Sequence, residues 1–161
     1  MTSIKHTIII CLILFMTSAC SMIKPIPSDI TIKLTTDTQL NPDRENRSSP
    51  VVLRIYQLSS DKIFKQSDFF QIYDNDKATL ADAMIKKQEL ELNPNESRKI
   101  DITPDAKTKF IGLLAAFQNM DNAKWQQVIK IKSHPPTGIP VYDNTVFDIS
   151  LNQNKINLLD N

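Results

Sequence analysis

Short stretches in which apolar and polar residues alternate are the feature that most limits what this chain can fold into. In Ile30–Thr35 the apolar residues take every second position, and Val51–Leu58 repeats the pattern with bulkier side chains. A period of two places apolar side chains on one face of a β-strand, because successive side chains of a strand point to opposite faces. The most apolar stretch, Lys109–Phe117, predicts a central strand. Polar segments that contain Pro, Asn and Asp separate these runs and are typical of loops.

The remaining segments complete an all-β pattern. Further strands are expected over residues 89–92, 99–102, 125–131, 146–151 and 155–159, the last two forming a hairpin. The mixed segment Ile63–Tyr73 predicts a short helix or an irregular packed segment, and Ala78–Lys86 predicts one or two helical turns. Long loops are expected over Asp37–Pro50 and Lys132–Pro140. About eight short strands with one or two short helices indicate a β-sandwich with a helical insertion.

The first twenty residues resemble a bacterial lipoprotein signal. Lys5 and His6 precede the apolar run Ile8–Met16. That run is too short for a membrane-spanning helix, which needs about 20 residues, but it suits a secretory signal. Small residues follow, and then Cys20, as in the lipobox, where the Cys thiol receives a diacylglyceryl group and becomes the new N-terminus. Ordinary signal cleavage nearby, which would leave Cys20 as a free thiol, is the alternative.

Cysteine usage favours the lipidated form. The chain has two cysteines, and because Cys11 lies within the signal, Cys20 is the one thiol left after cleavage. An unpaired thiol is unusual in an oxidising compartment, and acylation gives it a role. We therefore expect a signal peptide at residues 1–19, a lipidated cysteine with its tether at 20–29, and one sandwich domain at 30–161.

Residues suited to catalysis, metal binding or nucleic-acid recognition are sparse. Gly112 and Gly138 are the only glycines, which excludes Gly-rich phosphate loops, and a formal net charge of +1 provides no basic field for nucleic acid. His134 is the only histidine after the signal. It could act as the base of a serine hydrolase, but a solvated loop histidine is the simpler interpretation. One imidazole and one thiol cannot form a His- or Cys-based metal cluster. We expect no enzymatic activity, no cofactor and no metal.

The segment Asn41-Pro42-Asp43, followed by Arg47–Leu58 with the sequence RSSPVVLRIYQL, is distinctive. It resembles the type VI secretion outer-membrane lipoprotein family (TssJ, VasD or SciN). That family has an Asn-Pro-Asp loop and then a Ser-Pro-Val-Val-x-Arg-x-Tyr-Gln-Leu strand. The segments Ser67–Tyr73 and Leu114–Phe117, together with Trp125, fit the same family. The resemblance covers nearly all of the chain after the signal.

The resemblance implies a two-sheet, transthyretin-like β-sandwich with a helical addition, held on the periplasmic face of the outer membrane by lipid on Cys20. Ser21, the residue after the lipid cysteine, resembles an outer-membrane address in enterobacterial lipoproteins. The resemblance also implies binding to the periplasmic C-terminal part of the inner-membrane component TssM and, indirectly, to TssL. The family contacts TssM through the loop between its first two strands, here Asp37–Pro50. The partner-binding residues expected on this basis are Asn41, Pro42, Asp43, Arg44 and Arg47.

A periplasmic lipoprotein that binds a small molecule between its sheets is the main alternative. It requires a wide internal pocket. The bulky side chains expected to point inward instead predict a filled core; they are Leu53, Ile55, Leu113 and Phe117.

Replacing the lipidated cysteine tests the anchor directly. In Cys20→Ser no other thiol remains after signal cleavage, and stable attachment takes two or more acyl chains. We expect the protein to leave the membrane fraction while its domain stays folded. Membrane fractionation and metabolic labelling with a palmitate analogue measure this. Label incorporated into Cys20→Ser would contradict the assignment.

Overall fold

The computed structural model describes residues 26–27, 29–134 and 145–159 of the chain; Cys20 and residues 135–144 lie outside the described part. The strands are β1 (Ile26–Pro27), β2 (Ile30–Thr36), β3 (Val51–Leu58), β4 (Met84–Leu92), β5 (Ser97–Ile102), β6 (Phe110–Ala116), β7 (Gln126–Lys130), β8 (Ser133–His134), β9 (Thr145–Asn152) and β10 (Lys155–Leu159). Between β3 and β4 lie two α-helices and a 3₁₀ helix, which are α2 (Lys62–Gln66), α3 (Phe69–Leu80) and η2 (Ala81–Ala83).

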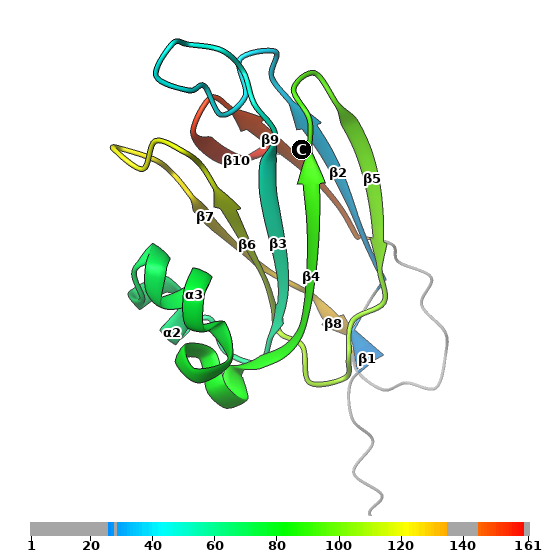
Figure 1. The fold of residues 1–161 in the computed structure, drawn as a ribbon. Helices are drawn as coiled ribbons and strands as arrows, with labels where there is room; N and C mark the ends of the chain where they lie inside the picture. The colour runs from blue at the N-terminus through cyan, green and yellow to red at the C-terminus, as the bar shows by residue number, and fades with distance from the viewer. Residues whose placement is uncertain (1–25, 28, 135–144, 160–161) are drawn as a thin grey trace, which may run out of the picture.

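Eight of these strands form two four-stranded sheets packed face to face (Figure 1). The first sheet has the order β10-β9-β2-β5, and the second has the order β4-β3-β6-β7. Strands β2 and β9 run parallel, and the other pairs among the described strands are antiparallel. The predicted two-sheet sandwich of about eight strands with a helical insertion is confirmed.

The core between the sheets follows the period-two pattern of the strands. In β2, Ile30, Ile32 and Leu34 are at most 1% exposed, and their counterparts on β3 are Val51, Leu53 and Ile55. These side chains pack between the two sheets, which Figure 1 shows as two layers. The filled core is confirmed, because Leu113 and Phe117 are buried in the same cluster. Trp125, expected in a strand, lies just before β7 and is only partly buried.

A second apolar cluster lies on the outer face of the second sheet, under the helices. Leu58 of β3 and Leu114 of β6 pack there against Phe64 of α2 and Ile72 of α3. Gly112 of β6 is required by this packing. A Cβ on Gly112 would lie 3.0 Å from both Leu58 Cδ1 and Phe64 Cζ, closer than side chains normally approach. Strand β3 is therefore covered on both faces.

Two local predictions need correction. Residues 84–86, predicted as helical, belong to the edge strand β4, which pairs with β3 from Met84 to Leu92 with one register shift at Ile85. The helix ends at Leu80, because Ala81 has a φ of 43°, outside the helical region. Ser133–His134, predicted within a loop, forms β8, and β8 pairs with Ile26–Pro27 of the segment expected as a tether. Pairing with a neighbouring strand outweighs local propensity in both places.

An ion pair between the buried Asp76 and the more exposed Lys87 links α3 to the second sheet. Lys87 Nζ of β4 lies 2.6 Å from Asp76 Oδ2, and the hydroxyl of Tyr56 lies 3.3 Å from the same oxygen. Burial works to raise the pKa of Asp76, but the hydrogen bond from Lys87 prevails and lowers it below its ordinary value. Burial raises the pKa of Tyr56 to about 12, so its hydroxyl stays protonated and donates.

Neutralising Asp76 should lower stability in a pH-dependent way. A hydrogen bond to a charged group contributes about 1.5–3 kcal/mol, and we expect Asp76→Asn to lose about that much free energy of unfolding at pH 7. Because the folded-state pKa of Asp76 is lowered, its contribution is present above pH ~4 and is lost as the pH falls further. In urea unfolding, the difference in free energy of unfolding between Asp76→Asn and wild type should be smaller at pH 3 than at pH 7. The exposed Asp74→Asn on the same helix is the control; an equal loss there would refute the assignment.

Candidate partner-binding surface

The loop of residues 37–50, between β2 and β3, contains a tight turn organised by Asp43. The backbone N–H of Asp43 donates to the Arg47 carbonyl at 2.9 Å. Asp43 Oδ1 accepts the N–H groups of Glu45 and Arg47, each at 2.9 Å, and Arg47 Nε lies 2.7 Å from Oδ2. The backbone hydrogen bond from Arg47 holds the pKa of Asp43 below its ordinary value. The turn is thus ordered by its own side chains.

Asn41 fixes the base of this loop. The residue is only 3% exposed, and its φ of 45° lies in the left-handed region that Asn tolerates. Asn41 Nδ2 donates to the Pro50 carbonyl at 2.7 Å, and Oδ1 accepts the Gln118 N–H at 2.7 Å. The Asn41 N–H donates to the Gln153 carbonyl at 2.7 Å. One residue therefore ties the loop to the β6–β7 connection and to the β9–β10 turn.

The five predicted contact residues fall into two groups. Pro42 and Asp43 are half-buried and Arg44 and Arg47 are exposed, all on or beside the turn. Arg47 pairs with Asp43 and with Glu45, whereas Arg44 forms no ion pair with the described residues. Asn41 lies beneath them and is a positioning residue in this geometry. The Asn-Pro-Asp motif thus combines a structural anchor with the start of an exposed turn.

A groove separates the turn from the connection between β6 and β7. It has a volume of about 500 Å³ and is lined on one side by residues 42–44 and on the other by residues 118–121. Sequence reasoning missed residues 118–121, whose polar character predicted only a loop between two strands. The hydrogen bond from Gln118 to Asn41, between residues far apart in sequence, brings the two loops together.

The loop lies at the end of the sandwich opposite β1 and the start of β2 (Figure 1). Strand β2 runs from Ile30 to Thr36, and seven residues at about 3.3 Å each span about 23 Å. The loop at residues 37–50 therefore sits roughly one strand length from the place where the chain enters the domain.

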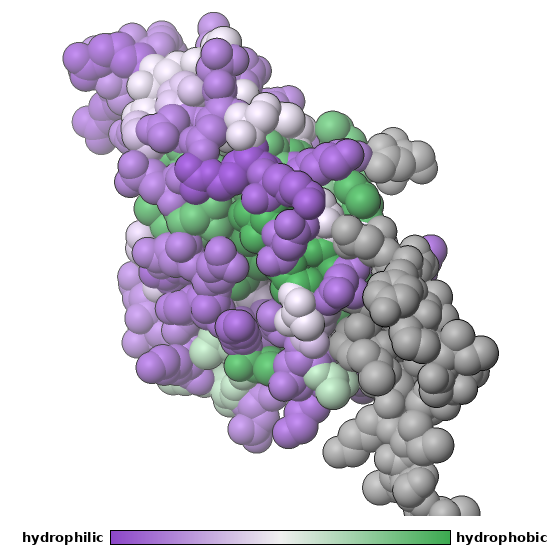
Figure 2. All heavy atoms as spheres, turned by 90° about the vertical axis from the view of Figure 1, so that its right-hand side faces the viewer, coloured by the Kyte–Doolittle hydropathy of each residue, from purple (hydrophilic) through white to green (hydrophobic). Residues whose placement is uncertain are grey.

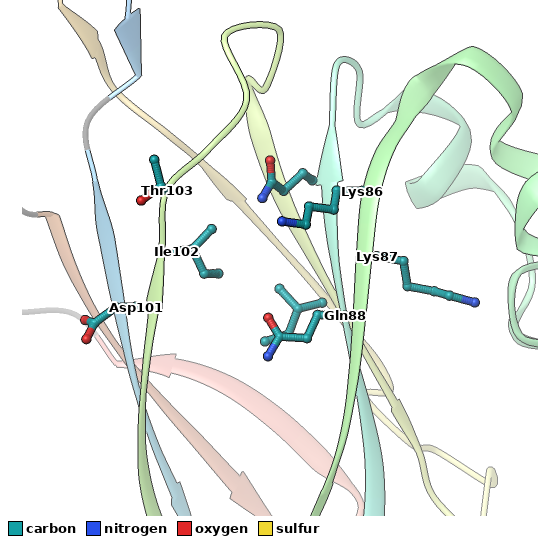
Figure 3. Close-up of a pocket in the computed structure, with 8 residues that line it drawn as sticks. Lys86, Lys87, Gln88, Asp101, Ile102 and Thr103 are labelled. Atoms are coloured by element: carbon teal, nitrogen blue, oxygen red, sulfur yellow. The ribbon is translucent and has the colours of Figure 1, made fainter.

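The edge strands β4 and β5 frame a second opening (Figure 3). Its volume is about 280 Å³, and Lys86, Gln88 and Ile102 are among its lining residues. Figure 2 shows apolar surface on this side of the molecule, between bands of polar residues. Lys86 and Gln88 lie opposite Gln57 and Ile55 of β3, and so occupy inward-facing positions. Inward charges on an edge strand discourage the addition of further strands.

The described residues offer little else for chemistry. No three His, Cys, Asp or Glu side chains among them are grouped as a metal site requires. No helix in this part of the chain is long and apolar enough to cross a membrane. The backbone of His134 belongs to β8, while its side chain lies outside the described residues.

A sequence profile described as type VI secretion lipoprotein, VasD, EvfM, TssJ matches residues 28–157. The chain belongs to this family. The match spans both sheets, the helices and the loop of residues 37–50, so this type VI secretion lipoprotein shares the whole domain with its relatives. No curated protein sequence gives a significant match.

Solved structures agree with the family assignment. The type VI secretion lipoprotein TssJ1 from Pseudomonas aeruginosa is 30% identical with a TM-score of 0.75, and the match covers 83% of this chain and 95% of that one. Serratia marcescens Lip, described as a membrane-bound component of the type VI secretion system, is 21% identical with a TM-score of 0.76, covering 84% and 99%. A chain of the structure described as the TssM C-terminal domain from EAEC is 20% identical with a TM-score of 0.67, covering 83% and 98%.

Alanine substitutions should separate the anchor of the loop from its exposed tip. Asn41→Ala leaves the Gln118 N–H and the Pro50 carbonyl without their partner and strains a left-handed backbone. We expect it to lower the free energy of unfolding by about 2–4 kcal/mol. Arg44→Ala, on the exposed turn, should change it by less than about 0.5 kcal/mol. Thermal and urea unfolding measure both; equal effects would mean that Asn41 does not anchor the loop.

Proposed function

We propose that this type VI secretion lipoprotein docks the periplasmic C-terminal domain of a TssM-like inner-membrane protein to the outer membrane, without catalysis. The contact surface is the loop of residues 37–50 together with residues 118–121 across the groove. The observation that carries the proposal is an ordered, charged loop placed at the end of the sandwich farthest from the chain entry. TssL would be joined only indirectly, through the TssM-like partner.

The comparisons support this partner. The family is one of type VI secretion lipoproteins, and a chain with the same fold occurs in a structure described as the TssM C-terminal domain. A lipoprotein that shares this fold is an appropriate outer-membrane partner for such a domain. The small-ligand alternative receives no support from the interior, because large apolar side chains fill the space between the sheets in the described residues.

The short segment between Cys20 and β1 supports the orientation of the domain relative to the membrane. Pairing of β1 with β8 holds Ile26 and Pro27 against the domain. If Cys20 carries the lipid, only residues 21–25 separate the lipid from this pair in the sequence. Their reach is at most about 20 Å, at about 3.3 Å per residue. The β1–β8 end of the domain then stays near the membrane, and the loop of residues 37–50 points into the periplasm.

The loop has the physical properties of a recognition element. The turn from Asp43 to Arg47 is already ordered in the free protein, which reduces the conformational entropy lost on binding. Its exposed charges have both signs, which favours a complementary polar patch on the partner. Arg44, with no ion pair among the described residues, is available for a carboxylate of the partner.

Replacing only the turn tests the proposal without removing its anchor. A chain in which Asp43–Arg47 is exchanged for Gly and Ser keeps Asn41 and its hydrogen bonds, so it should stay folded and lipidated. We expect its affinity for the purified periplasmic domain of the cognate TssM-like protein to fall at least tenfold, about 1.4 kcal/mol.

Isothermal titration calorimetry provides the measurement. The matched control exchanges residues 103–107, a loop at the opposite end of the sandwich, for Gly and Ser, and should bind like wild type. Unchanged affinity in a folded turn variant would move the interface away from this loop. Absence of binding by the wild-type protein would reject the proposed partner.

A further inference from the structure

We propose that a patch of apolar side chains beside the groove, here called the aromatic face, forms a second contact for the same TssM-like domain. It consists of Phe70 and Tyr73 of α3, and of Met120 and Trp125 from the connection between β6 and β7. This inference rests on the proposed function and extends its interface from the charged loop to the helical insertion.

Phe70 is the most exposed large apolar side chain among the described residues, at 64% of its full surface. An isolated exposed apolar residue needs no explanation. Phe70, however, does not stand alone, since Tyr73, Met120 and Trp125 are each partly exposed nearby. Phe, Tyr, Trp and Met are enriched at the centres of protein interfaces, where a few aromatic residues carry most of the binding energy.

The rings of this patch are already held in place. Phe69, buried beneath them, contacts Phe70 edge-to-face at 5.2 Å and Trp125 at 5.5 Å between ring centroids. It stacks on Tyr73 at 5.0 Å, and the Arg54 guanidinium lies 4.1 Å from the Tyr73 ring centroid. A patch whose rings are already packed loses little side-chain entropy when a partner covers it.

The backbone that presents Phe70 is also fixed. Asp68 caps α3, with the Gln71 N–H donating to Asp68 Oδ1 at 2.8 Å. In return the Asp68 N–H donates to Gln71 Oε1 at 3.0 Å, which completes a capping box. Phe70 therefore sits in the ordered first turn of a capped helix.

The aromatic face is continuous with the groove beside the loop of residues 37–50. Met120 lines that groove opposite Pro42 and Arg44, and it also packs against the apolar cluster that contains Phe69. Figure 1 shows α3, the β6–β7 connection and the loop on the same side of the sandwich. One partner surface can therefore cover the charged turn and the rings together.

The membrane is a poor candidate to cover this patch. Phe69 contacts Trp125, just before β7, so the first turn of α3 lies toward the loop end of the sandwich. The β1–β8 pair, through which the anchor would enter, lies away from the helices, across the width of the sandwich (Figure 1). A protein that already meets the loop is the occupant that fits this position.

Removing the exposed ring tests the inference. The protein is the mature chain with Cys20→Ser, titrated with the purified periplasmic domain of the cognate TssM-like protein in a calorimeter. Phe70→Ser should weaken binding at least tenfold, while Phe70→Tyr, which keeps the ring, should stay within about threefold of the parent. Ile63→Ser on α2 is the control, because Ile63 is also exposed, at 41%, but lies outside the patch. Circular dichroism melting should show all variants folded.

The outcomes separate this inference from the proposed function. If the parent binds and exchange of Asp43–Arg47 weakens binding, but Phe70→Ser does not, the aromatic face is refuted and docking through the loop stands. Equal losses in Phe70→Ser and Ile63→Ser would also refute it, because the effect would not be specific to the patch. No binding by the parent rejects the partner itself. If Phe70→Ser abolishes only a self-association seen by sedimentation velocity, the occupant is a second copy and the inference is wrong.

Discussion

The burial of β3 on both faces is the constraint on which the rest of the structure depends. Its inward residues, such as Leu53, meet the first sheet, while its outward residues, such as Leu58, meet the helices. Because one strand belongs to both apolar clusters, the sandwich and the helical insertion form a single packed unit. Gly112 shows how tight this arrangement is, since the ring of Phe64 occupies the space that any larger side chain at this position would need. The aromatic face is consequently carried by a rigid support.

Alternation was enough to predict the sandwich, because a strand with one buried face shows its period in the sequence. It located β2, β3 and the β9–β10 hairpin closely. It failed at residues 84–86, where an edge strand pairs with β3 but buries little, so the sequence kept an Ala-rich, helix-like appearance. It also missed the β1–β8 pair, because two residues are too few to show any period. A strand that does not bury one face and expose the other shows no alternation of apolar and polar residues in its sequence.

The candidate site was predicted only in part, and for a different reason. The polar, proline-containing loop of residues 37–50 was visible in the sequence, and the family resemblance assigned it a role. The sequence did not distinguish Asn41, the buried anchor, from the exposed residues beside it. Its burial and left-handed φ depend on hydrogen bonds to Pro50 and Gln118. Phe70 posed the opposite problem. The aromatic residues around it in the sequence are typical of a buried helix face, and only the orientation of α3 leaves the Phe70 ring exposed. Which side of a packed helix faces solvent is decided by tertiary contacts.

The two long sides of the sandwich differ in a way that bears on where a partner can bind. On one side Lys124 and Lys155 form a bridge between the sheets, and the Ile156 N–H donates to the Lys124 carbonyl at 2.9 Å. On the other side β4 and β5 leave an opening whose inward positions carry Lys86. A charged side chain there opposes both the entry of apolar ligands and the addition of a strand. Because one pair of sheet edges is bridged and the other carries inward charge, the ordered loop and the aromatic face are the surfaces best suited to a protein partner, and both lie away from the β1–β8 pair.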